Sequence, residues 1–353
     1  MISFQNDYSE GCHPKILERL TQENWKQRPG YGTDDICARA AEQIRSLCAN
    51  EDLAVHFLVG GTQTNATVIA AALRPHQAVI AAESGHIHVH ETGAVEATGH
   101  KVLAVSSQDG KLRAEDVRRV LEKHTDEHMV QPKMVYISHP TELGTLYSRQ
   151  ELASLRAVCR ENGLYLFLDG ARLGYAMASA ENDVVWQDLA WLCDAFYIGG
   201  TKVGALLGEA VVIANKEISR DFRYAVKQRG GMLAKGWLLG VQFDTLFQNE
   251  LYVEIAKHAV HLADKLRKTL HMCGYPLLLP GSTNQVFPVF SDSVLAELEK
   301  DFCFTFQQRI DECHQAVRIC TSWATKPEDV EALCSKLTLL CAEKQERNPY
   351  GDQ

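Results

Sequence analysis

The sequence predicts an α/β fold with a mainly parallel central sheet, followed by a smaller C-terminal α+β domain. From about residue 54 to 215, short apolar runs alternate with longer amphipathic segments. Most of these runs lack polar alternation, which is typical of strands covered on both faces. Strands separated by helices imply crossover connections and therefore parallel pairing. After about residue 230 the alternation ends, which places a second, smaller domain in the rest of the chain.

The elements of the sheet follow from runs rich in aliphatic and aromatic residues. The predicted strands are 54–59, 77–82, 100–106, 133–138, 164–169, 195–199 and 211–213. The predicted helices between them are 64–73, 114–124 and 149–163. The spacing of Val117, Val120 and Leu121 is that of one helix face, and Gly163 stops the third helix.

The C-terminal part begins with residues 234–274, which predict one long helical tract because no proline interrupts it before Gly274. The segments that follow are typical of a small α+β domain: 284–290, a helix near 292–300, 304–310, 316–323 and a final helix at 327–344. The tail 343–353 is expected to be disordered. We expect a large domain at 1–245 and a small domain at 246–353.

The length and net charge of the chain limit the number of domains and the kinds of molecule that it can bind. The chain has 353 residues, long enough for a large domain plus a smaller one. Its net charge is −9 and no stretch concentrates lysine and arginine. Nucleic-acid and anionic-membrane partners are therefore not expected.

The cysteine pattern and the N-terminal residues bear on the cellular compartment of the protein. Eleven cysteines are scattered along the chain without a Cys-x-x-Cys pair, so neither a disulfide framework nor a structural zinc site is expected. The start "MISFQNDYSE" lacks the features of a signal peptide, and no apolar run is long enough for a membrane span. We expect a soluble, cytoplasmic protein.

The stretch "LVGGTQTNAT" (58–67) is a candidate anion site. A strand ends, two glycines follow, and a helix starts after Thr62. Backbone N–H groups at a helix N-terminus bind anions, and glycine lets a phosphate approach closely. A plain turn from strand to helix is the alternative.

Three histidines alternate with apolar residues in "ESGHIHVHETGA" (83–94). On a strand, His86, His88 and His90 would share one face, which suggests a metal site. No carboxylate or cysteine signature of a metal site accompanies them, so no metal is predicted. We favour one of the histidines in a cofactor pocket.

An acid and a lysine follow two neighbouring strands. Asp169 ends the apolar strand "LYLFLD", and Lys202 follows the next strand among Gly199, Gly200 and Gly204. In parallel α/β sheets, sites lie beyond the carboxyl ends of the strands. A helix N-cap for Asp169 and an exposed turn for Lys202 are the alternatives. Together with a phosphate-binding turn, these residues are the parts needed for pyridoxal phosphate: a lysine for the Schiff base and an acid for the pyridine nitrogen.

The chain resembles the fold-type I pyridoxal-phosphate enzymes of the L-threonine aldolase and β-eliminating lyase group. The resemblance runs from "YGTDD" (31–35) to "RICTSW" (318–323). Four motifs arrive in the family's order and spacing: "GGTQTN", "SGHIHVHETGA", "LDGAR" and the Lys202 segment. The resemblance implies the fold-type I architecture, pyridoxal 5'-phosphate as the cofactor and a homodimer or homotetramer.

The resemblance also implies roles for individual residues. Lys202 matches the Schiff-base lysine, Asp169 the acid on the pyridine nitrogen, and His86 the histidine stacked on the ring. Gly61 and Thr62 match the phosphate-binding turn.

The resemblance places the substrate carboxylate between Arg172, in "DGAR", and Arg318, in "AVRICTS". An arginine suits this task because its guanidinium can bind a carboxylate through two hydrogen bonds. Closure of the small domain would bring Arg318 to the site.

The chain departs from the family pattern in four places. Asn6 stands where many members have the serine of Ser-Asp-Thr, and Thr201 replaces the serine before the lysine. Leu233 follows the Gly-Gly-Met turn where many members have an arginine. The segment "SHPTELGTLYS" (138–148) replaces an Asn-Thr-His segment.

The expected reaction is cleavage of an L-β-hydroxy-α-amino acid, such as L-threonine or L-allo-threonine, to glycine and an aldehyde. The hydroxyl proton needs a base, for which His86, His128 or a water molecule are candidates. A different alignment at Cα would give β-elimination or transamination instead. A cofactor-binding protein without catalysis and a metal protein using the three histidines are the alternatives from other classes.

Overall fold

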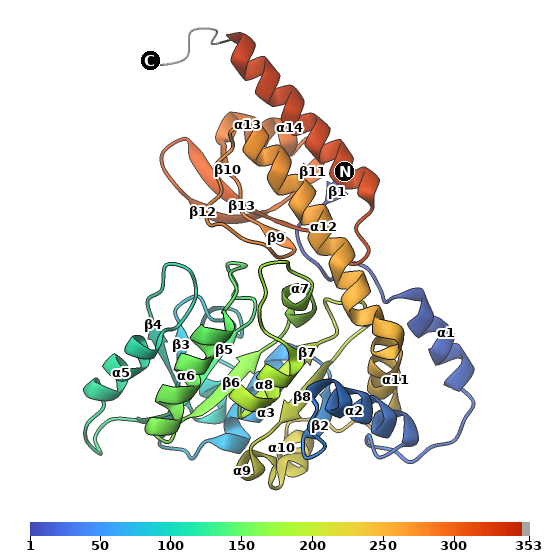
Figure 1. Ribbon diagram of the computed structural model, residues 1–353, viewed down its shortest axis with the longest axis vertical. Coiled ribbons are helices and arrows are strands. Elements are labelled where there is room, and N and C mark those ends of the chain that lie inside the picture. Colours follow the sequence, from blue (N-terminus) through green and yellow to red (C-terminus); the bar gives the residue numbers. More distant parts are fainter. Residues whose placement is uncertain (348–353) are drawn as a thin grey trace.

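The computed structural model describes residues 1–347 and contains a seven-stranded central sheet (Figure 1). The strand order is β2 (Ala54–Leu58), β8 (Glu209–Ile213), β7 (Ala195–Gly199), β6 (Tyr165–Asp169), β5 (Gln131–Ser138), β3 (Gln77–Ala82) and β4 (Lys101–Val105). The five strands from β7 to β4 pair in parallel, whereas β8 is antiparallel to both of its neighbours. The predicted α/β fold with a mainly parallel sheet is confirmed.

Both faces of the sheet are buried. Alternate residues along a strand belong to two different apolar clusters, one on each face. Ile80 and Phe196 belong to one cluster, and their neighbours Val79 and Tyr197 belong to the other. This burial explains why the strands are apolar along their whole length, and it agrees with the prediction that both faces of the sheet are covered.

Helices cover the two faces. One face is covered by α2 (Asp35–Cys48), α5 (Ala114–Lys123), α6 (Arg149–Glu161) and α8 (Trp186–Leu192). The other face is covered by α3 (Gly61–Ala72), α9 (Lys216–Ser219) and α10 (Phe222–Gln228). The three predicted helices are present, although α3 begins three residues earlier than expected, at Gly61.

Side chains fix where these helices start. Asp34 accepts hydrogen bonds from the backbone N–H groups of Ile36 and Cys37 at the start of α2. Ser148 and Glu151 form a capping box at the start of α6. Such caps satisfy N–H groups that have no partner inside the helix.

The predicted single tract 234–274 is wrong. It consists of α11 (Trp237–Leu246), a 3₁₀ turn at Gln248–Glu250 and α12 (Leu251–Met272). Asn249 and Glu250 have φ angles of 52° and 58°, which an α-helix cannot continue through. Nothing in the composition of the tract signals this break.

The C-terminal part packs an antiparallel sheet against helices (Figure 1). The sheet contains β9 (Gln285–Val286), β10 (Val289–Ser291), β12 (Thr305–Arg309) and β13 (His314–Cys320). The helices are α13 (Asp292–Leu298), α14 (Pro327–Arg347) and the second half of α12. The expected disorder from residue 343 is wrong as far as Arg347, where α14 ends, and residues 348–353 lie outside the described chain.

The N-terminus reaches the C-terminal part. β1 (Ile2–Ser3) pairs with β11 (Phe302–Cys303), and Phe4 is buried in the apolar cluster of that part. The chain then passes to α1 (Pro14–Glu23), which packs on α11. The short helix α7 (Leu173–Met177) follows β6 and packs on α12.

Within residues 1–347, none of the helices is both long enough and apolar enough to cross a lipid bilayer.

Tyr252 on α12 should stabilise the fold through its hydroxyl. The hydroxyl is buried, donates to the carbonyl of Gly199 (2.8 Å) and accepts from the N–H of Gly174 (3.1 Å). Tyr252→Phe leaves both backbone groups without this partner, so we expect the free energy of unfolding to fall by about 1–3 kcal/mol. Urea unfolding measures the loss, with Tyr224→Phe as the control because Tyr224 is 78% exposed. Equal unfolding curves for the two variants would contradict this account.

Candidate active site

A cavity of about 350 Å³ lies beyond the carboxyl ends of the parallel strands. Six residues predicted for the site line it: Gly61, Thr62, His86, Asp169, Arg172 and Lys202. They come from the start of α3, from the loops after β3, β6 and β7, and from the end of β6 itself. The sheet therefore brings together residues that lie up to 141 positions apart, from Gly61 to Lys202.

Asp169 is buried and held by four donors. Its carboxylate accepts from the hydroxyls of Tyr136 and Tyr197 (both 2.5 Å), from the side-chain amide of Asn65 (3.1 Å) and from the backbone N–H of Ala171 (3.0 Å). Burial alone would raise the pKa of Asp169, but the charge of His86 and these hydrogen bonds outweigh it and hold the pKa below its usual value. The carboxylate is therefore ionised and can pair with a cation in the cavity.

His86 starts the short helix α4 (His86–Val89), so the three histidines do not share one face of a strand. Its Nδ1 lies 2.8 Å from Oε1 of Glu91, which is buried. Burial lowers the pKa of His86, but the hydrogen bond with Glu91 and the charge of Asp169 bring it above the usual value. The ring is thus held in a fixed orientation beside the cavity.

The helical turn brings two of the three histidines together. His90 lies beside His86, with 5.5 Å between ring centroids, and both His88 and His90 are exposed. None of the three belongs to a group of side chains within residues 1–347 that could share a metal ion.

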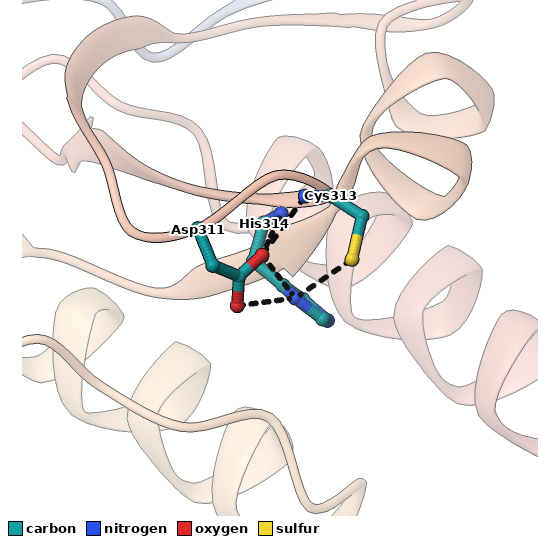
Figure 2. A group of neighbouring side chains, drawn as sticks. All are labelled: Asp311, Cys313 and His314. Atoms are coloured by element: carbon teal, nitrogen blue, oxygen red, sulfur yellow. Dashed lines mark hydrogen bonds and ion pairs between the residues drawn. The ribbon is translucent and has the colours of Figure 1, made fainter.

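One such group lies elsewhere, in the turn between β12 and β13, formed by Asp311, Cys313 and His314 (Figure 2). Asp311 there accepts from the backbone N–H groups of Cys313 (2.9 Å) and His314 (2.8 Å). These two hydrogen bonds stabilise the turn, so the presence of Asp311 at this position is explained without a metal ion.

Lys202 lines the cavity in the loop after β7. Burial and the charge of Arg172 lower the pKa of its amine, while Asp7, Asp169 and Glu209 oppose part of that change. A lowered pKa increases the fraction of neutral amine, which is the form that attacks an aldehyde. Lys202 is therefore not an exposed turn residue.

Glu209 at the start of β8 faces the same region. It accepts from the hydroxyl of Thr201 (3.2 Å), and its Oε2 is buried without a hydrogen-bond partner within the described residues. Burial raises the pKa of Glu209. An unpaired buried oxygen beside Lys202 indicates that a polar group belongs in this space.

The start of α3 is open to an anion. Gly60 caps the helix without a side-chain hydrogen bond, so the N–H groups of the first turn remain for a ligand. A Cβ on Gly61 would lie 3.1 Å from the hydroxyl of Tyr197, which donates to Asp169. A side chain at position 61 would thus disturb the acid as well as the anion site.

Arg172 is already part of a buried ion pair. Its Nε and Nη2 donate to the two carboxylate oxygens of Asp7, at 2.7 and 3.0 Å. Asn284 also donates to Asp7 (2.9 Å). Three distant segments therefore meet at this carboxylate, and Nη1 is the nitrogen of Arg172 that Asp7 does not engage.

Arg318 and Asn6 do not line the cavity in this structure. Arg318, on β13, donates from Nη2 to the carbonyl of Gln5 (3.2 Å), and its buried Nε has no hydrogen-bond partner within the described residues. Burial and the charge of His86 lower the pKa of His90, and the charge of Arg318 adds to this shift. The oxygen of the Asn6 side chain accepts from the backbone of Tyr8 (3.0 Å) and the hydroxyl of Ser9 (2.9 Å).

His128 is not near the cavity of its own chain. It is exposed and precedes β5, whereas the cavity lies at the far end of that strand. Eight residues of strand span about 26 Å. The prediction of His128 as a base is therefore wrong for this chain.

Several residues of the site escaped sequence reasoning. Tyr136, Tyr197 and Asn65 hold Asp169 from 33, 28 and 104 positions away, so no local pattern links them to it. The sequence does place a tyrosine in each of two predicted strands, Tyr136 in 133–138 and Tyr197 in 195–199. These strands precede and follow the strand that ends in Asp169, which is the one sequence feature that could have indicated the contact.

The residues present fit pyridoxal phosphate. The open start of α3 suits the phosphate, the ionised Asp169 suits a protonated ring nitrogen, and Lys202 suits the aldehyde. His86 can cover one face of the ring. The unpaired oxygen of Glu209 is consistent with a polar ligand that completes the site.

Replacing Asp7 should destabilise the protein in a pH-dependent way. Burial raises the pKa of Asp7, but the charge of Arg172, reinforced by hydrogen bonds from Arg172 and Asn284, lowers it overall. Its stabilising effect is thus complete above the unfolded pKa of about 3.9 and is lost as the pH falls through the folded pKa. We expect Asp7→Asn to cost about 3–5 kcal/mol of unfolding free energy at pH 7, because Arg172 is left unpaired.

Urea unfolding at pH 7 and at pH 3 measures this difference between wild type and Asp7→Asn, which should shrink at the lower pH. Asp35→Asn is the control, since Asp35 forms an exposed ion pair with Arg39. A difference that is the same at both pH values would contradict the ion-pair account.

Comparisons with known proteins agree with this geometry. A family model described as beta-eliminating lyase matches residues 15–293. A low specificity L-threonine aldolase of Pseudomonas aeruginosa is 31% identical over 96% of this chain and 97% of its own. Another, from a Pseudomonas species, is 32% identical over 84% of this chain and 86% of its own.

Solved structures share the fold of this chain. A threonine aldolase of Leishmania major superposes with a TM-score of 0.96 at 47% identity, covering 97% of this chain and all of that one (100%). A putative L-allo-threonine aldolase of Listeria monocytogenes, at 19% identity and a TM-score of 0.72, covers 98% of this chain and 96% of its own and shares the fold. The match over most of the length, together with the cavity that contains Lys202 and Asp169, shows that the chain belongs to the beta-eliminating lyase family.

Proposed function

We propose that the protein is a pyridoxal-phosphate-dependent aldolase that cleaves L-threonine, L-allo-threonine or a related L-β-hydroxy-α-amino acid to glycine and an aldehyde. The observation that carries this proposal is the shared cavity of Lys202, Asp169, His86 and the open start of α3. The relatives named as threonine aldolases, one of them matched over nearly its full length, support the reaction type.

Each group of the site has a task. The amine of Lys202 binds the cofactor aldehyde, and the N–H groups at Gly61 and Thr62 bind its phosphate. Asp169, ionised and held by four donors, keeps the ring nitrogen protonated. When bound, pyridoxal phosphate supplies a protonated ring that accepts the electron pair released at Cα of the substrate.

The substrate carboxylate is proposed to lie between two arginines. Arg172 lines the cavity, and Asp7 orients its guanidinium by engaging Nε and Nη2. Arg318 has an unpaired buried Nε, which suits an anion that arrives with the substrate. Asn6 lies one residue before Asp7 and can add a polar contact. Holding the carboxylate between these arginines would select which bond at Cα breaks.

The site is proposed to be completed in a homodimer or homotetramer. Three large apolar side chains stay exposed beside the cavity: Tyr8 at 52%, Leu206 at 42% and Leu207 at 36%. Tyr8 and Leu207 also line it. Contact with a second copy of the chain would cover these side chains and exclude water from the cavity mouth.

A cytoplasmic location is part of the proposal. Among residues 1–347, all eleven cysteines are free thiols, which suits a reducing compartment.

Lys202→Ala should remove both the cofactor linkage and the reaction. We expect purified wild type to carry the visible absorption band of the bound cofactor and to release acetaldehyde from L-threonine or L-allo-threonine. The variant should lack the band and the acetaldehyde, because it has no amine at this position. Lys235→Ala is the control, since Lys235 is an exposed lysine outside the cavity.

The products also test the reaction type. Wild type that forms a 2-oxo acid and ammonia in place of acetaldehyde and glycine would be a β-eliminating lyase, contrary to the proposal. Wild type without cofactor, even after pyridoxal phosphate is added, would contradict the whole assignment.

A further inference from the structure

Cleavage of a β-hydroxy amino acid requires a base for the hydroxyl proton, and within one chain neither histidine candidate suits this task. His128 lies at the opposite end of β5. His86 shares its Nδ1 with Glu91, and its pKa lies above the usual value, because the hydrogen bond with Glu91 and the charge of Asp169 outweigh burial. A raised pKa increases the protonated fraction of His86, and a protonated ring cannot accept the hydroxyl proton.

Glu142 is a carboxylic acid in the same cavity that none of the steps above uses. It lies in the loop between β5 and α6, within the segment where the chain departs from the Asn-Thr-His pattern. Its side chain is half-buried, as expected of a group that faces a cavity.

The loop that carries Glu142 is a tight turn. The N–H of Thr141 donates to the carbonyl of Thr145 (2.9 Å). The N–H of Gly144 donates to the carbonyl of Thr141 (2.9 Å). Gly144 has a φ of 76°, a conformation that favours glycine. The backbone around Glu142 is therefore defined on both sides.

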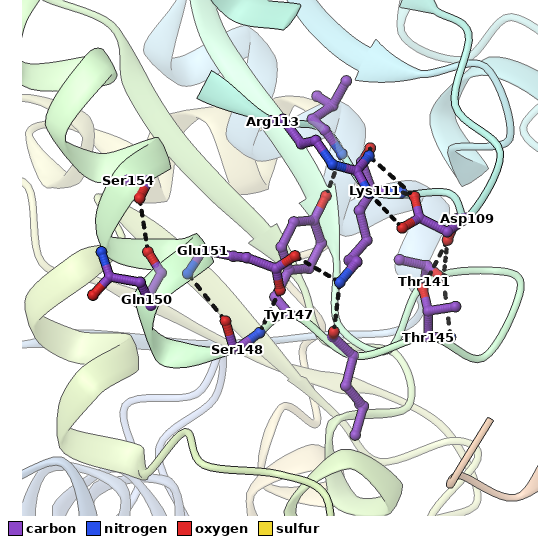
Figure 3. Close-up of polar contacts among 12 residues, drawn as sticks. Asp109, Lys111, Arg113, Thr141, Thr145, Tyr147, Ser148, Gln150, Glu151 and Ser154 are labelled. Carbon is purple, nitrogen blue, oxygen red and sulfur yellow. Dashed lines mark hydrogen bonds and ion pairs between the residues drawn. The ribbon is translucent and has the colours of Figure 1, made fainter. Parts of the chain in front are cut away.

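Further polar contacts anchor this turn to the loop before α5 (Figure 3). The hydroxyls of Thr141 and Thr145 lie 2.7 Å apart, and Thr145 donates to the carbonyl of Asp109 (2.7 Å). Lys111 donates to the carbonyl of Leu146 (3.2 Å). The turn thus rests on a second loop and is not free to move away from the cavity.

The anchoring continues to the start of α6 (Figure 3). The ammonium of Lys111 also pairs with Glu151 (2.7 Å), which belongs to the capping box of that helix. The hydroxyl of Tyr147, which is buried, accepts from the N–H of Leu112 (2.6 Å). These contacts fix the end of the segment that contains Glu142.

The carboxyl group itself is held by two donors of the cavity. Oε1 of Glu142 accepts from the hydroxyl of Ser138 (2.7 Å) and from the backbone N–H of His86 (2.8 Å). Both donor residues also line the cavity. The two hydrogen bonds use one oxygen, so the other oxygen is left to take up a proton.

The surroundings shift the acid toward the neutral range. Burial raises the pKa of Glu142, and the charge of Asp169 adds to this, whereas the hydrogen bonds from Ser138 and His86 oppose it in part. A general base works best when its pKa approaches the working pH.

We propose that Glu142 is the base that removes the β-hydroxyl proton of the substrate, a role that rests on the aldolase function proposed above. The O–H bond breaks and its proton moves to the carboxylate of Glu142. The Cα–Cβ bond breaks as the carbonyl of the aldehyde forms, and the electron pair is left at Cα, where pyridoxal phosphate, when bound, would stabilise it. A proton added to Cα then gives glycine, and Glu142 returns its proton to solvent.

Glu142→Gln separates this role from a structural one. The amide oxygen of glutamine can still accept from Ser138 and His86, but it cannot take the proton. We expect kcat for cleavage of L-threonine to fall by about 10²–10⁴-fold. The absorption band of the bound cofactor, the unfolding temperature and the exchange of the α-proton of glycine with D2O should stay near wild type, since none of them involves a β-hydroxyl.

Ser138→Ala gives a second, independent readout. The variant keeps the carboxylate but loses a hydrogen bond that lowers the pKa of Glu142. The pKa of Glu142 rises, so the acidic limb of the pH profile of kcat/KM should move to higher pH. Asp169 on β6, Tyr136 on β5 and Tyr147 before α6 are the titratable groups that interact with this acid, and His86 donates to it through its backbone N–H. All four residues remain in the variant.

Glu83→Gln is the matched control, because Glu83 is an exposed acid that does not line the cavity. Cleavage by Glu142→Gln at the rate of wild type would overturn the proposal. Loss of glycine exchange and cofactor binding together with cleavage would also overturn it, in favour of a structural role. If wild type exchanges the α-proton of glycine but releases no acetaldehyde, the aldolase function fails, and the role of Glu142 fails with it.

Discussion

The whole site depends on an ionised carboxylate buried at the end of a central strand. Burying Asp169 would be costly by itself, and four hydrogen bonds offset this cost. The donors come from α3, from the flanking strands β5 and β7, and from the backbone after β6. Burial raises the pKa values of Tyr136 and Tyr197, which keeps their hydroxyl protons available for donation. The sheet therefore does more than place Asp169: its neighbouring strands keep it charged.

The central part of the fold could be predicted because its signals are local. Short apolar runs, most of them without alternation, marked all seven strands, and their order along the chain implied crossovers. The break at Asn249 and Glu250 could not be predicted, since two residues in the left-handed conformation leave no mark in an amphipathic tract. Nor could the helix at His86, because an alternating pattern over only five residues suits a strand as well as a helical turn. In both places contacts with distant segments decide the local conformation.

The site divides in the same way. Motifs with fixed spacing led to Lys202, Asp169, His86 and the turn at Gly61, and the structure brings them to one cavity. Asp7 escaped notice because its partners, Arg172 and Asn284, lie 165 and 277 positions away. Arg172 was expected to bind the substrate carboxylate together with Arg318, and the structure adds a buried ion pair in which Asp7 holds two of its nitrogens. The acid at position 142 was visible only as a departure from the family pattern.

The central claim is that one lysine carries the cofactor. Borohydride reduction of the purified holoenzyme, followed by proteolysis and mass spectrometry of the peptides, tests it most directly. The account predicts a pyridoxyl group on Lys202, because this lysine lines the cavity beside Asp169 and has a lowered pKa. A pyridoxyl group on a different lysine, or an unmodified Lys202 in protein that shows the visible band of the cofactor, would contradict the account.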